Sequence, residues 1–564
     1  MSALIQKRED TPPQVSPAAS GAVPPGGRAP GPDLASGRSS VGDVADRSGR
    51  SVRESPLTGT ALALGTIALS LATFMNVLDT SIANVAIPAI AGDVGVSPDQ
   101  GTWVITSFAV ANAISMPLTG WLTRRLGQVR LFVASTLLFV LASFLCGLAP
   151  SLTMLVVFRA LQGAVAGPMI PLSQSLLLSS YPKAKAGAAL AVWSMTTLVA
   201  PVVGPVLGGW ITDNYSWPWI FYINVPIGIA AAIVAWVIYS RRETPTARLP
   251  IDKVGLALLI VWVGAMQVLL DKGKNLDWFN SPAIVALAVI AVVCFAVFLV
   301  WELTDEHPVV DLSLFRVRNF SVSAIAMLVA YGLYFGNVVL LPLWLQQYMG
   351  YTATLAGFVL APVGLLAIVL TPFVGRFLNR VDPRWVVTSS FLVFALVMFM
   401  RSDFDTQADV RTLLIPTLIQ GAGLATFFIP LLMLAFSGLA PDRIPSASGL
   451  INFARITAGS FATSITTTLW DRRATLHHEQ LVEHLTRSNA AMTQALAQLH
   501  AGGLTTQQGY ALLNNLVDNQ AYMLSANDIF YVSGFLFVVL VGLVWFAHPT
   551  KLGGAGGEAA AGAH

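Results

Sequence analysis

Residues 74–88, FMNVLDTSIANVAIP, place an aspartate near the far end of the first long apolar segment of the chain. An ionisable group inside a membrane span costs a few kcal/mol, and it usually persists because it moves protons, ions or substrate. On a helix, Asn76, Asp79 with Thr80, and Asn84 fall on one face. We therefore expect a transmembrane helix whose polar stripe looks inward, away from lipid.

A second charge, Arg159, lies inside another apolar segment and is a plausible partner for Asp79. Both residues also have structural interpretations. The alternative for Asp79 is a residue that caps a helix break near Pro88, and the alternative for Arg159 is a helix anchor that bonds backbone carbonyls. We favour a transport role for the pair, because no other carboxylate lies as deep within an apolar segment.

Composition supports a membrane protein. The chain has 564 residues, of which 55% are hydrophobic and only 11% are charged, whereas soluble domains carry about 25% charged residues. Segments of about 20 apolar residues recur along most of the length, which is typical of a polytopic helical protein. The net charge of +3 is too small to imply nucleic acid. The fourteen segments lie near 61–90, 101–122, 129–149, 152–181, 186–212, 217–239, 254–270, 282–302, 320–346, 355–378, 384–401, 411–437, 445–470 and 526–547.

The two ends of the chain have a different composition. Residues 1–56 are rich in Pro, Gly, Ser and Arg and contain no apolar core of signal-peptide length, so we expect a disordered cytoplasmic tail without a cleaved leader. The Gly- and Ala-rich residues 553–564 are expected to form a second flexible tail. Cys146 and Cys294 both fall in apolar segments, which predicts buried thiols without a disulfide framework.

Lysine and arginine predict the orientation. With fourteen spans both termini lie on one side, and that side carries 23 Lys and Arg residues against 7 on the other, with Arg159 and Arg455 left within spans. Positive residues concentrate on the cytoplasmic side. We therefore expect a multi-pass protein of the bacterial inner membrane with both termini in the cytoplasm.

The two ends of the apolar region echo one another. Gln162-Gly163-Ala164 reappears as Gln420-Gly421-Ala422, and Asn84-Val85 as Asn337-Val338, and such echoes lie 253 to 259 residues apart. This offset predicts two six-helix halves, 57–240 and 320–552, separated by two inserted helices with linkers over 241–319. Parallel halves with a site at their interface are a known transporter plan. Convergent use of small residues in membrane helices is the alternative.

Glycine, proline and arginine form three further motifs. The first is a basic turn between the second and third segments, with Gly120, Arg124, Arg125, Gly127 and Arg130. The second runs from Arg159 through Gln162 and Gly163. The third, residues 200–209, includes Gly204, Pro205, Gly208 and Gly209. Proline interrupts backbone hydrogen bonding and glycine permits close helix packing, so these residues are candidates for conformational roles.

With the aspartate segment, these motifs resemble the major facilitator superfamily, and residues 200–209 are similar to its antiporter signature. The runs 100–108, 217–226 and 301–320 are similar to the fourteen-span drug:proton antiporter branch, and the resemblance extends from about Leu57 to the C-terminus. It implies an all-α fold of two six-helix halves plus two central helices. It also implies a periplasmic adaptor (a membrane fusion protein of the EmrA type) and an outer-membrane channel of the TolC type as partners. One departure is Arg124, where the superfamily usually carries an aspartate, so a charge relay through that position is not assumed.

The resemblance and the residue pattern together define candidate sites. Proton coupling is assigned to Asp79 and Arg159. Arg455, on a stripe with Asn452 and Gly459, is the mirror candidate in the second half, where a substrate role and a structural role remain equally open. The aromatic candidates are each also explained by packing or by an interfacial belt. The candidate substrate-cavity residues are Asn76, Thr80, Asn84, Trp103, Phe108, Asn112, Gln162, Trp193, Tyr334, Asn337, Gln420 and Arg455.

The longest hydrophilic connection, within the second half over residues 471–525, is expected to face the periplasm. Its leucines follow a helical spacing that is broken at Gly502-Gly503, so we expect a helical hairpin that meets the adaptor. His477, His478, His484 and His500 gather there, but their irregular spacing and the absence of a neighbouring cysteine argue against a metal site.

The sequence therefore favours a proton-driven exporter of small hydrophobic and weakly acidic drugs, without cofactor or metal. Cavity arginines favour anionic amphiphiles. An exporter of an endogenous metabolite or lipid is the nearest alternative. A membrane-embedded enzyme is disfavoured, because the spans carry no His/carboxylate or thiol–His constellation, and the chain has no Gly-Lys-Ser/Thr loop for ATP.

Overall fold

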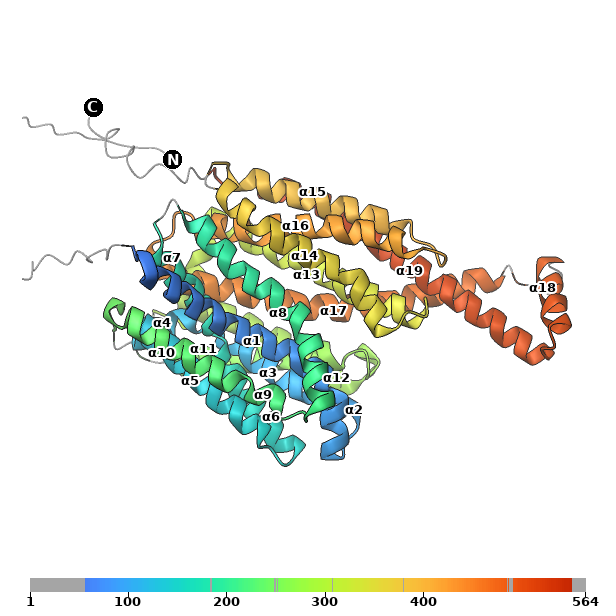
Figure 1. Ribbon diagram of the computed structural model, residues 1–564, viewed down its shortest axis with the longest axis horizontal. Coiled ribbons are helices and arrows are strands. Elements are labelled where there is room, and N and C mark those ends of the chain that lie inside the picture. Colours follow the sequence, from blue (N-terminus) through green and yellow to red (C-terminus); the bar gives the residue numbers. More distant parts are fainter. Residues whose placement is uncertain are drawn as a thin grey trace, which may run out of the picture. The chain divides into compact units, whose positions relative to one another are not determined.

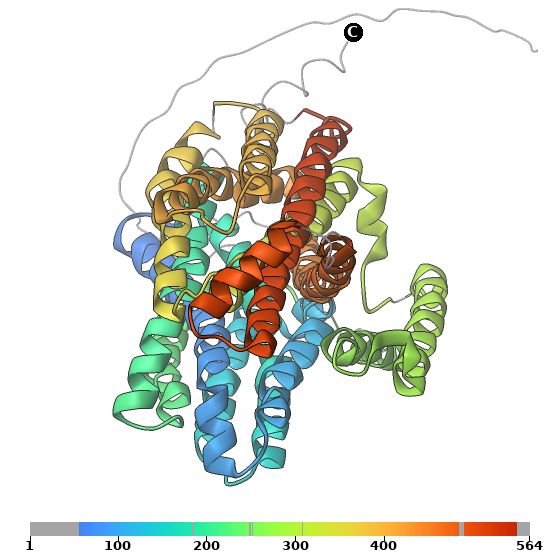
Figure 2. The same cartoon turned by 90° about the vertical axis from the view of Figure 1, so that its right-hand side faces the viewer.

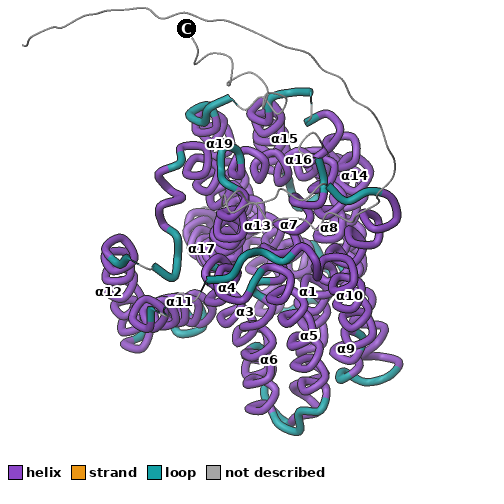
Figure 3. The backbone as a smooth tube through the Cα atoms, turned by 90° about the vertical axis from the view of Figure 1, so that its left-hand side faces the viewer, coloured by secondary structure: helices purple, strands orange, loops and turns teal. Residues whose placement is uncertain are grey.

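The computed structural model describes residues 56–549, apart from 183–184, 248–249, 251, 307, 379, 484 and 486–489. These residues form helices joined mostly by short connections, and no strand occurs among them (Figures 1 and 3). The predictions of disorder for residues 1–55 and 553–564 fall outside the described residues.

The first half of the described chain contains ten helices. The predicted single span 101–122 is two helices bent by 62°, because Pro117 lies in the break and cannot donate the hydrogen bond that would continue the first of them. The helices are α1 (Gly59–Val94), α2 (Pro98–Gly101), α3 (Trp103–Ser115), α4 (Thr119–Leu126), α5 (Gln128–Gly147), α6 (Leu152–Ala166), α7 (Met169–Ser180), α8 (Ala186–Asn214), α9 (Trp219–Tyr222) and α10 (Asn224–Tyr239).

Two long helices follow, and then the second half. The inserted region contains η2 (Ser240–Arg242), α11 (Lys253–Lys272), η3 (Trp278–Asn280), α12 (Pro282–Thr304) and η4 (Leu312–Arg316). The second half contains α13 (Arg318–Gln347), α14 (Ala353–Phe377), α15 (Pro383–Ser402), α16 (Val410–Phe436), η5 (Pro441–Arg443), α17 (Ile444–Glu483), α18 (Ala490–Ala501) and α19 (Thr506–Val544).

The helices are consistent with fourteen predicted spans. Within the described ranges, 11 helices or continuous helix pairs are long and apolar enough to cross a membrane, and the bent pair α3–α4 makes up to 12. The remaining two predicted spans correspond to α8, with 29 residues, and to α17, with 40 residues. The helices of the described chain are therefore consistent with the fourteen spans predicted from the sequence.

The same helix pairs pack together in both halves. In the first half α1 packs on α8, α3 on α6, and α5 on α10; in the second half α13 packs on α17, α14 on α16, and α15 on α19. These are the first with the fifth, the second with the fourth, and the third with the sixth span of each half. The packing thus repeats in the order that the sequence echoes predict.

The hydrophilic connection over 471–525 consists mostly of continuations of the two membrane helices that it joins, with one short helix, α18, between them. α17 continues to Glu483 and α19 already begins at Thr506, so both helices extend well beyond their apolar segments (Figures 1 and 2). Apolarity marks where lipid contact ends, but it does not mark where a helix ends. The predicted break is present, because α18 ends before Gly502 and Gly503 has a φ of 87°.

The histidines of this extension make separate polar contacts. His477 Nε2 lies 2.7 Å from Asp528 Oδ2, which also accepts a hydrogen bond from Arg473, whereas His500 Nδ1 lies 2.9 Å from the carbonyl of Leu504. His484 lies outside the described residues. No group of three or more metal-binding side chains occurs in the described part of the chain.

Candidate functional site

The carboxylate of Asp79 is buried in the first half, inside a cage of donors. Arg159 Nη1 donates to Asp79 Oδ2 at 2.5 Å, and both side chains are almost completely buried, with 0% and 1% exposure for Arg159 and Asp79. The other oxygen, Oδ1, accepts from Gln162 Nε2 at 3.1 Å and from Asn224 Nδ2 at 2.8 Å. The predicted pairing of Asp79 with Arg159 is therefore present, and α1, α6 and α10 meet at it.

The guanidinium of Arg159 is only partly satisfied. Its Nη1 also donates to Gln162 Oε1 at 2.8 Å, and its Nε donates to the carbonyl of Val104 at 3.1 Å. The ring of Phe108 covers it, with the centroid 4.2 Å from Cζ. Its Nη2 is buried without a hydrogen-bond partner among the described residues. Arg159 thus combines ion pairing, helix anchoring and a spare donor.

Asn224 is a member of this cluster that the sequence analysis did not single out. Besides donating to Asp79, its Nδ2 donates to Ser143 Oγ at 3.0 Å, and that hydroxyl donates to the carbonyl of Phe221 at 2.9 Å. Asn224 is fully buried at the start of α10. Its signal in the sequence was a lone amide in an otherwise apolar segment.

The remaining candidates of the first half have varied surroundings. Asn76 Nδ2 donates to the carbonyl of Ala166 at 3.1 Å, Thr80 is half-buried and Asn84 is exposed. Trp103 lies under Lys272 Nζ, 5.3 Å from its ring centroid, and Asn112 is buried with an unpartnered Oδ1.

Trp193 links the halves. It is buried, donates from Nε1 to Ser173 Oγ at 2.9 Å, and stacks on Phe428 of α16 at 6.2 Å between centroids.

A separate cavity of about 310 Å³ lies mainly in the second half. α13, α14, α15, α16 and α17 line it, and Ser194 and Thr197 of α8 add an edge from the first half. Four of the twelve candidate cavity residues line it, namely Tyr334, Asn337, Gln420 and Arg455, and none of the other eight does. The polar residues expected to form one cavity therefore divide into a charged cluster and a distinct pocket.

Arg401 is a buried cation that the sequence analysis did not single out as a candidate. It lies in the last turn of α15, is 1% exposed and lines the second-half cavity. Its Nη2 donates to Gln420 Oε1 at 2.7 Å and to Thr417 Oγ1 at 3.3 Å. The apolar run ends at Arg401 in the sequence, but neighbouring helices extend past it and cover it.

Glu302, near the end of α12, is likewise buried although it lies near the end of an apolar segment. It is only 3% exposed, and its Oε2 accepts from the backbone N of Val310 at 3.1 Å.

Gly120 of the basic turn lies where the halves touch. A Cβ at this position would overlap the hydroxyl of Ser446 at the start of α17, and a Cβ on its echo Gly375 would lie 2.6 Å from Ala191 Cβ in α8. Gln174 of α7 accepts from Asn452 Nδ2 at 3.2 Å and from the hydroxyl of Ser448. These contacts lie toward the helix ends nearest the termini, so the halves are closed together on that side.

The rest of the basic turn surrounds Glu243. Gly127, with a φ of 89°, allows Glu243 to accept from the backbone N of Val129 at 3.0 Å and of Arg130 at 2.8 Å. Arg125 lies over Trp121 at 5.3 Å, and the carbonyl of Arg124 accepts from the backbone N of Ala247.

The antiporter-like motif packs α8 on α1. A Cβ on Gly204 would lie 2.6 Å from Ser81 Cβ, and one on Gly208 would lie 3.0 Å from Ile82 Cγ2, whereas nothing lies within 4 Å of Gly209. Pro205 falls within α8. Two of the three candidate glycines therefore have a close contact that requires them.

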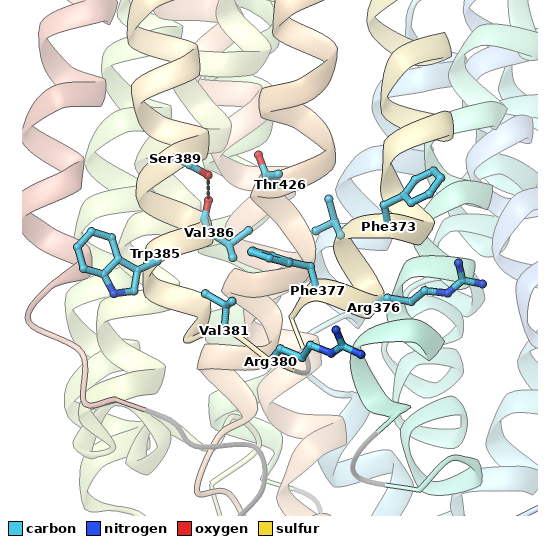
Figure 4. Close-up of a pocket in the computed structure, with 10 residues that line it drawn as sticks. Phe373, Arg376, Phe377, Arg380, Val381, Trp385, Val386, Ser389 and Thr426 are labelled. Atoms are coloured by element: carbon cyan, nitrogen blue, oxygen red, sulfur yellow. Dashed lines mark hydrogen bonds between the residues drawn. The ribbon is translucent and has the colours of Figure 1, made fainter.

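A larger hollow, of about 900 Å³, is an open apolar groove on α14, α15 and α16 (Figure 4). Phe373, Phe377 and Trp385 are 62%, 55% and 59% exposed, as expected for side chains that face lipid. The side chains of Arg376 and Arg380 point away from Trp385 (Figure 4). This groove is separate from both polar clusters.

Comparison with known proteins agrees with this arrangement. A sequence profile described as Major Facilitator Superfamily matches residues 69–463. The chain belongs to the major facilitator superfamily. It is therefore a multi-pass membrane transporter and not an enzyme.

Two curated relatives align over nearly their whole length. The chain is 52% identical over 509 residues to the multidrug export protein EmrB of Escherichia coli, covering 90% of this chain and 99% of that protein. It is 50% identical over 503 residues to the fatty acid resistance protein FarB of Neisseria gonorrhoeae, covering 89% and 99%. The sequence resemblance to the drug-exporting branch is confirmed.

Solved structures confirm the fold. The superfamily's proton:xylose symporter XylE aligns with a TM-score of 0.56 at 16% identity, covering 87% of this chain and 97% of that chain.

Proposed function

We propose that this protein is a proton-driven efflux antiporter of the bacterial inner membrane that exports hydrophobic and weakly acidic toxic compounds. The observation that carries the proposal is the Asp79–Arg159 pair, a titratable carboxylate 2.5 Å from a guanidinium in the core of a transporter. The names of the relatives, one for multidrug export and one for fatty acid resistance, support the substrate class.

Asp79 is the proposed proton-binding group. Protonation removes the charge of the carboxylate, so the attraction between Arg159 Nη1 and Asp79 Oδ2 weakens. The added proton also makes one carboxyl oxygen a hydrogen-bond donor, although its neighbours Arg159 and Asn224 are donors themselves. Arg159 already has an unpartnered Nη2. Loss of the ion pair therefore frees the contact among α1, α6 and α10, and the two halves rock to expose the opposite side.

The proton gradient supplies the energy. Each proton contributes about 1.4 kcal/mol per pH unit and about 2.3 kcal/mol per 100 mV of membrane potential. In the proposed cycle a proton from the periplasm binds Asp79 and is released into the cytoplasm, where both termini lie. Substrate enters from the cytoplasm or the inner leaflet and occupies the second-half cavity beside Arg455.

The helical extension of α17, α18 and α19 is proposed to dock a periplasmic adaptor of the EmrA type, which connects to an outer-membrane channel of the TolC type. Its length supports this, because a bare connection between two membrane spans needs only a few residues.

The test is transport of a fluorescent hydrophobic drug in inner-membrane vesicles with an imposed pH gradient. Asp79→Asn should abolish gradient-driven accumulation while the protein still inserts. Glu302→Gln is the matched control, because Glu302 is equally buried but lies outside the cluster, and it should retain transport. Wild-type transport by Asp79→Asn would place the proton site elsewhere.

A further inference from the structure

The two halves each hold a glutamine at an echoing position, but the charged groups around the two glutamines differ. Gln162 and Gln420 occupy echoing positions of α6 and α16. Gln162 Oε1 accepts from Arg159 Nη1 at 2.8 Å, and Gln420 Oε1 accepts from Arg401 Nη2 at 2.7 Å. Each half thus holds a buried guanidinium against its glutamine.

The guanidiniums come from different helices. With the offset of Gln162 and Gln420, Arg159 corresponds to Thr417. With the offset of Gly120 and Gly375, the echoing glycines that precede α5 and α15, Arg401 corresponds to Cys146, whose Sγ lies 3.6 Å from Gln162 Oε1. The second half therefore has an arginine where the first half has a thiol.

The carboxylate has no counterpart in the second half. With the offset of Asn84 and Asn337, the position of Asp79 corresponds to Gly332. Among the described residues, no carboxylate lies within 4.0 Å of Arg401 or Arg455, although Asp79 lies 2.5 Å from Arg159. Two cations line one cavity without an anion to balance them.

Arg401 also has unused hydrogen-bonding capacity beside this cavity. Its Nε and the Nε2 of Gln420 are both buried without partners in the described chain, and both residues line the cavity. A buried charge is unfavourable unless it is paired and hydrogen-bonded. A guanidinium and an adjacent amide N–H together match the two oxygens of a carboxylate.

The rest of the cavity suits an apolar body. Its walls include Leu360, Val363, Leu424 and Phe427, and the cation of Arg455 lies over the rings of Phe428 and Tyr331 at 5.1 and 5.7 Å. A volume of about 310 Å³ is at the small end of ligand pockets. The occupant is therefore small, with one anionic end and a lipophilic remainder.

We propose that Arg401 and Gln420 bind the ionised carboxylate of a lipophilic monocarboxylic acid, whose apolar body occupies the second-half cavity. The acid's role as an exported substrate rests on the proposed function, but its binding requires neither a proton gradient nor a partner protein. Arg401 is thus the residue that distinguishes acids from neutral compounds of the same shape.

The test compares octanoate with octanamide, which differ only in the head group, by calorimetric titration of the full chain in nanodiscs near pH 7.5. Charge-assisted hydrogen bonds contribute enough for an effect of about tenfold or more. Arg401→Gln should raise the Kd for octanoate by about tenfold or more and leave the Kd for octanamide within about twofold. Thr417→Val, which removes only the weaker contact of Arg401, should leave both unchanged.

Gln420→Glu is the second variant, because it keeps the shape of the side chain and supplies Arg401 with a carboxylate, as in the first half. It should fold and should lose octanoate binding while retaining octanamide binding. Equal losses for both ligands, unchanged octanoate binding in both variants, or no saturable octanoate binding by the wild type would each overturn the proposal.

The outcome is independent of proton coupling. If binding is selective for the head group and Asp79→Asn transports normally, the carboxylate site is supported and Asp79 is rejected as the coupling residue. If Asp79→Asn loses transport but binding shows no head-group selectivity, Asp79 is supported as the coupling residue and the carboxylate site is rejected.

Discussion

In the first half the guanidinium of Arg159 lies 2.5 Å from the carboxylate of Asp79, whereas in the second half Arg401 and Arg455 have no carboxylate at ion-pair distance among the described residues. The two halves share a packing pattern and a glutamine at the same place. One framework therefore holds a self-neutralised pair, which we propose as the proton switch, and an uncompensated cationic pocket, which we propose as an anion site. Repetition of the fold does not imply repetition of the chemistry.

The largest expected effect comes from making the first half resemble the second. Asp79→Asn should leave Arg159 buried and unpaired, at a cost of about 3–5 kcal/mol, and should abolish gradient-driven transport. Adding Arg159→Gln should recover much of the lost thermal stability without recovering transport. Thermal unfolding in detergent and vesicle transport measure the two effects separately.

Recovery of both stability and transport in the double variant would mean that the pair is only structural. That outcome would remove the functional contrast between the halves.

The second effect tests another feature that both halves share, the close glycine contact with the opposite half. Gly120→Val should collide with Ser446, and Gly375→Val with Ala191, so each should open the contact on the terminus side and lower transport by about tenfold, the effect of about 1.4 kcal/mol. The readout is maleimide labelling of Ser448→Cys in a background without the native cysteines, because Ser448 is buried in that contact.

Gly357→Val is the matched control for Gly375 on the same helix, since nothing lies within 4 Å of Gly357. Faster labelling in this control as well would show that the change is not specific to the contact between halves.

The third effect distinguishes the amides of the two polar regions. Asn224→Ala removes a donor to Asp79 and to Ser143, which should cost about 1–3 kcal/mol of stability and reduce proton-coupled transport. Asn337→Ala removes contacts to the carbonyl of Leu333 and to Ser533, so it should lower stability by a similar amount while coupling per transported molecule stays the same. Parallel measurements of thermal stability and of proton flux check this; a coupling defect in Asn337→Ala would contradict the division of roles.

The smallest effect lies within the antiporter-like motif. Gly209→Ala should be neutral or slightly stabilising, by up to about 1 kcal/mol, because nothing lies within 4 Å of Gly209. Gly204→Ala, five residues earlier on α8, should be destabilising because its Cβ would lie 2.6 Å from Ser81 Cβ. Thermal unfolding of both variants gives the comparison, and an equal loss of stability would mean that the motif acts through helix flexibility and not through packing on α1.

Much of the framework was predictable from the sequence. Hydropathy located the membrane helices, and the cost of a charge in lipid singled out Asp79 and Arg159 as partners. The shared offset predicted two halves, which the repeated helix pairing confirms. These properties depend on the free energy of transferring single segments from water to lipid, which is determined by the residues of each segment.

The tertiary structure alone decided which polar residues share a site. Arg401 ends an apolar segment, so its depth depends on how far neighbouring helices extend beyond it. Asn224 contacts Asp79 only because α10 packs beside α1. The division of the expected cavity into a charged cluster and a cationic pocket has the same origin. Composition determines whether a segment is buried in lipid, but the neighbours of a side chain are determined by packing between segments that are far apart in the chain.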